Sequence, residues 1–243
     1  MKIIELDKTT STNQYLMNLA SEGKAVHETI VIAEEQTAGK GQGENLWVSE
    51  PGMNLTFSMY VKYLMKANTQ AWMSKSIALA VFDFISLYTQ NAVIKWPNDI
   101  LVNDKKIAGI LIEHFITGQN LNGTVIGVGV NLNQEKFPAE IQAISLKEIT
   151  GAKFKVKDAL KTMSVCLKSR LHTYELQKWD NIDSEYHKNL LGYGRECVFR
   201  LKTGKETTAF HRGVDALGRI VLETPGVEKN FFDVQEVKWV GFK

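Results

Sequence analysis

Apolar and polar positions along the first 190 residues follow both helical and strand-like patterns. Apolar residues spaced three and four apart predict helices over residues 11–23, 70–90, 156–178 and 180–191. Short runs rich in β-branched residues predict strands over residues 29–36, 92–96 and 123–133. Because helices mix with strands and hairpins, the sequence predicts an α+β fold with a mixed or antiparallel sheet flanked by helices.

Two local patterns refine this prediction. Residues 53–61 alternate strictly between apolar and polar side chains, and the apolar ones are Met53, Leu55, Phe57, Met59 and Val61. Since successive strand side chains point to opposite faces, this run predicts a half-buried strand. At the start of the first helix, Ser11 and Gln14 have the spacing of a capping box.

The stretch KWPNDILVNDKKIAGILIE, residues 95–113, predicts a β-hairpin with Asn103 and Asp104 in its turn. Strand alternation places Lys106 on the same face as three apolar residues, which are Ala108, Ile110 and Ile112. A buried ammonium group is costly unless it is paired. Two interpretations stay open from this stretch alone: Lys106 reaches water from the strand end, or it faces a functional partner.

The pattern changes near residue 194. The runs ECVFRLKTG, TTAFHRGVD, GRIVLET and FFDVQEVKWV are short, strand-like and separated by tight turns, with no helical spacing. Such a series is typical of a small all-β barrel. We therefore expect two domains, residues 1–192 and residues 193–243.

Composition narrows the classes of partner. The chain has 243 residues, 44% of them hydrophobic, and a net charge of +2, which gives no electrostatic case for binding nucleic acid or an anionic membrane. Its two cysteines form no CxxC pair, which argues against structural zinc and a disulfide framework. No segment has the length and apolar character of a signal peptide or membrane span. We expect a cytoplasmic protein.

A glycine-rich loop, AGKGQG at residues 38–43, follows the strand predicted over residues 29–36. Its glycines allow successive backbone N–H groups to point at one bound anion, and Lys40 adds a positive charge beside them. The loop matches neither a dinucleotide-binding GxGxxG nor a P-loop. A flexible connection is therefore an equal alternative.

Other polar groups lie at fixed corners of the predicted fold. Pro97 rigidifies the turn that presents Asn98 and Asp99, and this oxygen pair suits Mg²⁺ beside a triphosphate, although both residues also favour ordinary turns. Free N–H groups and hydroxyls at the helix start suit a polar ring ligand or a simple cap; the residues there are Ser11, Thr12 and Asn13. Gly127 and Gly129 within an apolar strand indicate either close approach of backbone or of a ligand, or equally a bulge.

Four segments occur in the order and spacing of bacterial biotin protein ligases: TSTNQYL, EQTAGKGQ followed by Trp47, KWPNDILVNDKKIAGILIE, and IGVGVNLN. The C-terminal β domain resembles the SH3-like domain of that family, so the resemblance covers nearly the whole chain. It implies a catalytic domain of the type shared with class II aminoacyl-tRNA synthetases. It also implies an enzyme that joins biotin to ATP, giving biotinyl-5′-adenylate, and passes biotin to a lysine of a biotin carboxyl carrier protein or domain.

The resemblance assigns roles to matching positions. Lys106 is implied as the catalytic cation between the biotin carboxylate and the α-phosphate. The implied biotin-binding positions are Ser11, Thr12, Asn13, Gln36, Gly39, Lys40, Gly41, Gln42, Lys106, Gly109, Gly127 and Gly129. The implied positions for ATP or the adenylate are Lys40, Trp47, Lys95, Asn98, Asp99 and Asn131. Asn98 and Asp99 are also expected to hold Mg²⁺, directly or through water.

The loop departs from the family pattern GRGxxGRxW, because it reads GKGQGENLW here. Lys40 replaces the first arginine, Gln42 takes the next basic position, and Gly43, Glu44 and Asn45 disturb the second GR pair. Lysine lacks the planar fork with which arginine holds a phosphate. We therefore expect the adenylate to be retained differently in this protein.

Bifunctional members of the family carry an N-terminal DNA-binding domain before the catalytic STN segment. That segment begins at residue 11 here, so we expect a ligase that is not a repressor. A lipoate or octanoate ligase is the nearest alternative, and a non-enzymatic nucleic-acid binder is a distant one. The sequence leaves monomer and homodimer both open.

Overall fold

The computed structural model describes residues 2–43, 45–224, 226 and 229–243. The first sheet has the strand order β1-β2-β3-β8-β7-β6-β5, with β1 and β2 parallel and the other neighbours antiparallel. Its strands are β1 (Lys2–Thr9), β2 (Thr29–Gln36), β3 (Leu55–Val61), β5 (Ala92–Lys95), β6 (Asp99–Val102), β7 (Lys105–Thr117) and β8 (Asn120–Val130), and β4 (Met65–Lys66) pairs with β8. This mixed sheet confirms the predicted α+β class.

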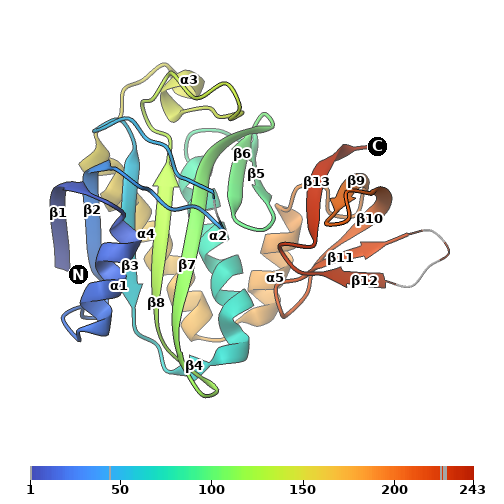
Figure 1. Cartoon of the computed structure of the whole chain (residues 1–243), viewed down its shortest axis with the longest axis horizontal. Helices are drawn as coiled ribbons and strands as arrows, with labels where there is room; N and C mark the ends of the chain where they lie inside the picture. Colours follow the sequence, from blue (N-terminus) through green and yellow to red (C-terminus); the bar gives the residue numbers. More distant parts are fainter. Residues whose placement is uncertain (1, 44, 225, 227–228) are drawn as a thin grey trace.

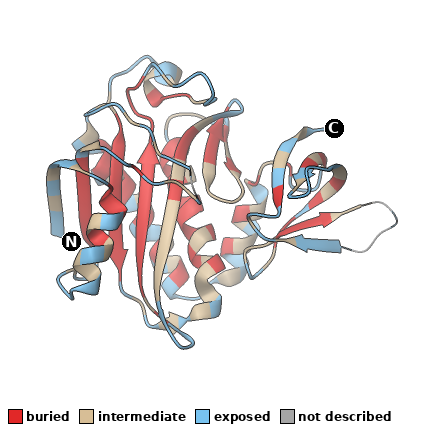
Figure 2. Ribbon diagram, viewed as in Figure 1, coloured by how far each residue is buried: buried red, intermediate tan, exposed pale blue. Residues whose placement is uncertain are grey.

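Helices cover both faces of this sheet (Figure 1). They are α1 (Thr12–Ser21), the 3₁₀ turn η1 (Ala67–Thr69), α2 (Gln70–Ser86), α3 (Leu146–Thr150), α4 (Val156–Glu175) and α5 (Trp179–Lys188). The large core lies between the sheet and α2, α4 and α5, whereas α1 packs on the opposite face through Leu16. The most buried segments in Figure 2 are accordingly the central strands and the inner sides of α2 and α4.

The second sheet is antiparallel and has the order β12-β11-β10-β9-β13. It consists of β9 (Glu196–Leu201), β10 (Glu206–Val214), β11 (Ile220–Glu223), β12 (Lys229–Phe232) and β13 (Val237–Phe242) around its own apolar cluster. This arrangement agrees with the predicted SH3-like β-barrel. The domain boundary at residues 192–193 stays a prediction.

Several contacts join the C-terminal sheet to the rest of the chain, and the side chains of Lys75 and Trp96 make two of them. Lys75 of α2 is buried, pairs with Asp183 at 2.5 Å and donates to the Val214 carbonyl at 2.8 Å. Burial lowers the pKa of Lys75, although the carboxylate of Asp183 opposes that effect. The indole Nε1 of Trp96 donates to the Gly218 carbonyl at 3.0 Å. The C-terminal sheet is therefore fastened beside the Trp96–Pro97 corner.

The helices and strands follow the hydrophobic pattern closely, and the predicted hairpin turn is confirmed, with Asn103 and Asp104 both at positive φ (50° and 61°). The predicted capping box is wrong: Ser11 is the N-cap residue of α1, but its side chain makes no cap hydrogen bond. Gln14 instead bonds Asn18 and accepts from Lys40.

The prediction of a half-buried strand over residues 53–61 is also wrong. Every residue of β3 is buried, including the polar residues Thr56 and Ser58. The reason is that the sheet is covered twice, by α2 and α4 on one face and by α1 with the glycine-rich loop on the other. Strand alternation identifies two faces, but it does not reveal that a second layer covers the polar one.

The predicted face of Lys106 is wrong as well. Leu101 of β6 is opposite Lys106, whereas the preceding Ile100 is opposite Ala108, so Ile107 is one extra residue in β7. Such a bulge breaks strand alternation. Ile107 and Ala108 both enter the large core. Lys106 lies on the other face, beside Gly109, where a Cβ would be 3.2 Å from Lys106 Nζ.

Candidate active site

The α1 face of the sheet has a floor made of two aligned rows of residues. In one row Ser58, Gly127 and Leu111 lie opposite one another in neighbouring strands, and in the next row Thr56, Gly129 and Gly109 do so. Asp99 of β6 extends the second row, because it is opposite Gly109. Since neighbours in register point to the same face, the glycines create a depression flanked by polar side chains.

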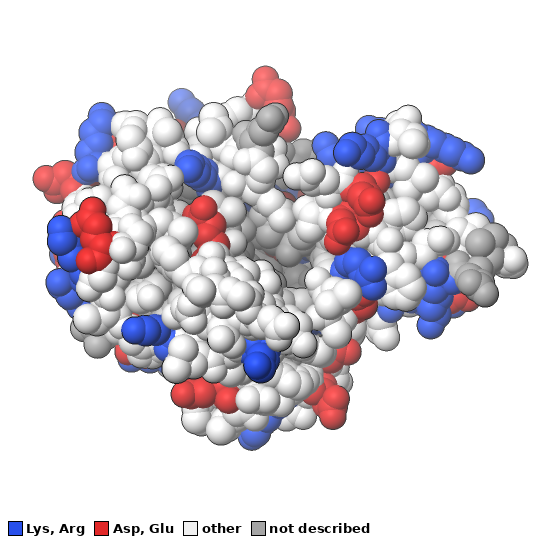
Figure 3. Space-filling model, turned by 60° about the horizontal axis from the view of Figure 1, so that its bottom comes forward, with Lys and Arg blue, Asp and Glu red and all other residues white. Residues whose placement is uncertain are grey.

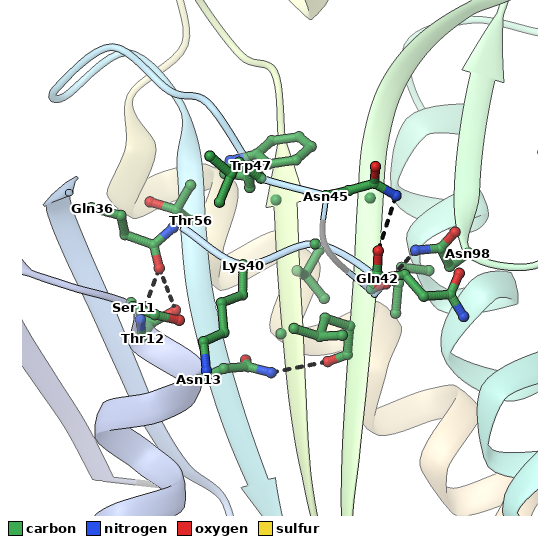
Figure 4. A pocket seen from close by; sticks show the side chains of 18 of the residues that line it. Ser11, Thr12, Asn13, Gln36, Lys40, Gln42, Asn45, Trp47, Thr56 and Asn98 are labelled. Carbon is green, nitrogen blue, oxygen red and sulfur yellow. Dashed lines mark hydrogen bonds between the residues drawn. The ribbon is translucent and has the colours of Figure 1, made fainter. Parts of the chain in front are cut away.

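This depression is a cavity closed from above by the glycine-rich loop (Figure 4). A Cβ on Gly127 would lie 2.2 Å from Asn13 Oδ1, and one on Gly129 would lie 2.3 Å from Trp47 Cε2. No side chain fits at either position without displacing its neighbour. The groups that approach these glycines are the side chains of Asn13 and Trp47, and neither glycine lies at a bulge, so the predicted bulge is wrong.

The end of the cavity at α1 is a buried hydrogen-bond network. Thr12 donates to Gln36 Oε1 from its backbone nitrogen at 2.8 Å and contacts the same oxygen through its hydroxyl at 3.1 Å. The Ser58 hydroxyl lies 2.8 Å from Thr12 Oγ1 and 2.5 Å from Asn13 Oδ1. Ser11 is also buried here. Polar groups of several segments thus converge on one end of the cavity.

The loop from Gly39 to Trp47 folds back on itself over this floor. Gly41 donates to the Asn45 carbonyl and Trp47 donates to the Gly39 carbonyl, both at 2.8 Å. Glu44, which departs from the family pattern, lies outside the described residues. The Trp47 indole covers Gly129, and its buried Nε1 has no hydrogen-bond partner among the described residues.

The side chain of Lys40 extends from the loop toward the start of α1 (Figure 4), where Nζ donates to Gln14 Oε1 at 2.9 Å. This contact is exposed to solvent. Lys40 lines the cavity, but its ammonium group is directed at α1 and not at the opposite, charged end.

The other end of the cavity carries opposite charges. Lys106 Nζ lies 2.6 Å from Asp99 Oδ1, and the two atoms form an ion pair without hydrogen-bond geometry. The same Nζ lies 5.7 Å from the centre of the Trp47 ring. The Lys106 and Asp99 side chains are 31% and 22% exposed, so both remain within reach of a ligand from the cavity. Asn98 is fixed by donating from Nδ2 to the Ile110 carbonyl at 3.0 Å.

The structure gathers most of the predicted site residues around this cavity: Ser11, Thr12, Asn13, Gln36, Lys40, Gly41, Gln42, Trp47, Asn98, Asp99, Lys106, Gly109, Gly127 and Gly129. Their individual roles stay predictions. Three predicted residues lie elsewhere. Gly39, the first residue of the loop, packs against the backbone of Trp47. Lys95 lies at the junction with the C-terminal sheet, and Asn131 is buried with its amide donating to the Lys106 and Ile144 carbonyls.

Asn131 has a structural explanation in this position. By bonding the Lys106 carbonyl, its side chain holds the backbone at the bulge that turns Lys106 toward the cavity. Lys95 precedes the Trp96–Pro97 peptide bond, which is cis, and lines a small space with Trp96 and His211. Neither residue lines the cavity that the other predicted residues share.

Sequence reasoning missed several residues that line the cavity, namely Asn45, Leu46, Thr56, Phe57, Ile110, Leu111 and Val128, and it also missed Ser58 of the buried network. Thr56 and Ser58 could have been found, because the alternation of residues 53–61 places both on the polar face. The others line the cavity through the loop fold and strand register, which one sequence does not reveal.

His114 and His211, two of the five histidines of the chain, lie outside the residues that line the cavity. Burial lowers the pKa of both His114 and His211 to about 4, so each is neutral near pH 7. His114 Nδ1 contacts Thr124 Oγ1 at 2.9 Å, and His211 Nδ1 contacts the Leu191 carbonyl at 3.1 Å. No group of three His, Cys, Asp or Glu side chains among the described residues is placed to hold a metal ion.

A sheet face floored by glycines, with a buried polar end and a charged end, is suited to hold a small molecule on this mixed-sheet domain. The model of the biotin/lipoate A/B protein ligase family matches residues 5–131. The chain belongs to this family.

Known relatives extend this likeness over most of the chain. A bifunctional ligase/repressor of Bacillus spizizenii is 30% identical over 235 residues, which span 93% of this chain and 71% of the relative. A biotin–[acetyl-CoA-carboxylase] ligase of Mycobacterium tuberculosis is 29% identical over 228 residues, covering 90% and 82% of the two chains. The structure of a biotin protein ligase from Aquifex aeolicus in complex with biotin and ATP superimposes with a TM-score of 0.77 at 23% identity, over 98% of this chain and 99% of that one.

Proposed function

We propose that this protein is a biotin protein ligase, which activates biotin with ATP and transfers it to a lysine of a biotin carrier domain. The observation that supports this most strongly is the pairing of two different ends in one cavity. The buried polar network at α1 suits a neutral polar ring such as the ureido ring of biotin. The lysine at the other end suits the meeting of a carboxylate with a phosphate.

The first step joins two anions. A biotin carboxylate oxygen attacks the α-phosphorus of ATP, the bond from that phosphorus to the bridging oxygen breaks, and pyrophosphate leaves with the bonding electrons. Lys106 places a fixed positive charge where the negative charges approach, which lowers their repulsion in the transition state. Because Lys106 is held by Asp99 in the free protein, its ammonium group is already at the charged end before ATP arrives.

The second step needs no further cofactor. The neutral amine of a carrier lysine attacks the acyl carbon of the adenylate, AMP leaves, and the nitrogen releases a proton to give an amide. The adenylate is a mixed anhydride that water hydrolyses, so the loop over the cavity protects it until the lysine arrives. Trp47 and Gly41 contribute to this cover through their backbone bonds across the loop.

A magnesium ion fits the donor set of the charged end. Asp99 offers a carboxylate and Asn98 a side-chain carbonyl, which are hard oxygen ligands that magnesium accepts when water and phosphate oxygens complete its shell. The Asn98 amide nitrogen is occupied by the Ile110 carbonyl, which leaves its oxygen available. When bound there by Asp99 and Asn98, the ion would supply positive charge beside the leaving pyrophosphate.

The partner we propose is a biotin carboxyl carrier protein or domain, and the site of action is the cytoplasm. The chain has no helix, within the residues described, that is long and apolar enough to cross a membrane. Acidic and basic side chains are both present over the catalytic and C-terminal parts on the face drawn in Figure 3.

A lipoate or octanoate ligase is not favoured as an alternative, because two relatives that are 29% identical over 90% of this chain are named biotin–[acetyl-CoA-carboxylase] ligases. The test is mass spectrometry of an apo carrier domain of acetyl-CoA carboxylase after incubation with the protein, ATP, Mg²⁺ and either biotin or lipoate. We expect one biotinyl group per carrier, dependent on ATP, and no lipoyl group. Lipoylation without biotinylation, or no modification at all, would overturn the proposal.

A further inference from the structure

Glu113 ends the apolar run of β7, and nothing in the proposed chemistry uses it. Its carboxylate lies on the cavity face of the sheet, one row beyond Leu111 and Gly127, opposite Val125. Glu113 Oε2 accepts a hydrogen bond from Asn13 Nδ2 at 2.9 Å. We propose that Glu113 is a positioning residue that sets the direction of the hydrogen bonds at the biotin end of the cavity. This inference rests on the proposed function.

The first step concerns the amide of Asn13. Asn13 is 3% exposed and packs directly over Gly127, so its side chain has no room to move aside. Its Nδ2 faces two acceptors, the Glu113 carboxylate at 2.9 Å and the Leu111 carbonyl at 3.2 Å. A reversed amide would point an oxygen at both of them, and a carboxylate makes that arrangement especially unfavourable. Glu113 therefore fixes which way the amide of Asn13 faces.

The second step follows from counting hydrogens. Once the amide is fixed, Asn13 Oδ1 can only accept, so the single hydrogen of the Ser58 hydroxyl is directed at it. Ser58 then has only lone pairs for Thr12, and Gln36 Oε1 is an acceptor too. The Thr12 hydroxyl must give its hydrogen to one of these two oxygens.

The result is a defined chemical character at the cavity. With its hydrogen committed inside the protein, Thr12 Oγ1 offers only acceptor lone pairs to a ligand. The ureido ring of biotin has two N–H donors, and an acceptor fixed before binding needs no reorganisation to receive one of them. Without the Glu113 charge, the amide of Asn13 can reverse, Ser58 can redirect its hydrogen, and the acceptor at Thr12 is no longer imposed.

The experiment measures biotin affinity by calorimetry without ATP for wild type and Glu113→Gln, which keeps the shape and removes the charge. We expect ~10-fold weaker biotin binding, because a hydrogen bond to a charged group contributes more than a neutral one. The KM for ATP and kcat at saturating biotin should stay within about twofold of wild type, a split that general loosening of the fold would not produce. Glu5→Gln is the matched control, since Glu5 pairs with Lys157 at the surface outside the cavity.

A double-mutant cycle tests whether Glu113 acts through Asn13. If it does, adding Glu113→Gln to Asn13→Ala causes little further loss of biotin affinity. If Glu113→Gln lowers the melting temperature, Ser58→Ala is measured in its place. Ser58→Ala removes one hydroxyl of the same chain of hydrogen bonds, so it must also lower the affinity for biotin. Wild-type affinity in either variant, or additive losses in the cycle, would overturn this inference alone. Failure of the wild-type protein to bind biotin would instead overturn the proposed function.

Discussion

The two ends of the cavity are built in different ways. At the α1 end, Thr12, Asn13 and Ser58 are buried and bonded to one another, and the network reaches outward to Gln36 and Glu113. At the corner end, Lys106 and Asp99 are partly exposed and held by one ion pair. The first end is fixed before any ligand arrives, whereas the second holds charges that a ligand can take over.

This difference has an energetic reason. A buried polar network is stable only when its members are satisfied, and its geometry then admits one pattern of donors and acceptors. That property suits recognition of a neutral ring. A partly exposed ion pair is weak, because water and salt screen it. Lys106 can therefore exchange Asp99 for phosphate and carboxylate oxygens at small cost. We infer that specificity resides at α1 and that chemistry resides at the corner.

The largest expected effect comes from Lys106→Ala. Loss of a preorganised charge of this kind lowers the rate of adenylate formation by ~10²–10³, while the partly exposed position leaves the melting temperature close to wild type. Biotin-dependent pyrophosphate release and a thermal melt measure the two properties. Lys105→Ala, on the exposed neighbouring residue, is the control. Near-wild-type release from Lys106→Ala would remove this residue from the mechanism.

The second effect concerns Asn98→Ala and Asp99→Ala. Asn98→Ala removes an amide group and Asp99→Ala removes a carboxylate from the charged end. The KM for ATP in the presence of Mg²⁺ should therefore rise ~10-fold in each variant, the loss typical of one hydrogen bond or contact to a charged group. Biotin affinity measured without ATP should change far less. The opposite result, with biotin affinity lost and use of ATP intact, would reverse our assignment of the two ends.

A smaller effect is expected from Trp96→Phe. This change keeps an aromatic ring at the junction but removes the N–H that donates to the Gly218 carbonyl. Loss of one neutral hydrogen bond should change the KM for ATP by ~3-fold. Because Trp96 precedes the corner, the KM for ATP should rise while biotin affinity stays constant. Trp179→Phe on α5, which stacks on Trp72, serves as the control. Equal effects of both variants would indicate general loosening only.

The smallest effect on synthesis is expected at Lys40. Its ammonium group reaches Gln14 at a solvent-exposed contact, so Lys40→Ala should keep most adenylate synthesis but release pre-formed biotinyl-adenylate about threefold faster, as the loss of one modest bond predicts. Lys40→Arg should retain the adenylate longer only if the side chain leaves Gln14 and turns to the phosphate, to which arginine offers a planar fork. Gln14→Ala separates the two explanations: a rate equal to that of Lys40→Ala assigns the effect to the Lys40–Gln14 contact. If Lys40→Ala retains the adenylate as long as wild type, the cover acts through backbone groups alone.

The sequence predicted the helices and central strands well, because their apolar spacing follows directly from burial on one face. It missed β1 and α3. β1 is an edge strand whose residues are mostly exposed, so its pattern is faint, and α3 is only five residues long. The segments that the sequence predicted to form the site do line one cavity, because the sheet places these chain positions side by side.

What the sequence could not predict depends on register. A single bulge at Ile107 moves Lys106 from the core face to the cavity face, and no residue type announces it. The contact between Asn13 and Glu113 joins residues 100 positions apart, and it exists only because the helix start lies over β7. Such pairings depend on tertiary contacts that local patterns do not encode.

The most direct test of the account is pyrophosphate release measured with ATP and Mg²⁺, with and without biotin, in the absence and presence of an apo carrier domain. Without the carrier domain, we predict that adding biotin to ATP and Mg²⁺ gives a burst of about one pyrophosphate per protein molecule, because the adenylate stays under the loop. With the carrier domain present, we predict continuous release of pyrophosphate. Release that ignores biotin, or the absence of any burst when biotin and ATP are both present, would contradict the claim that one cavity binds biotin at α1 and activates it at Lys106.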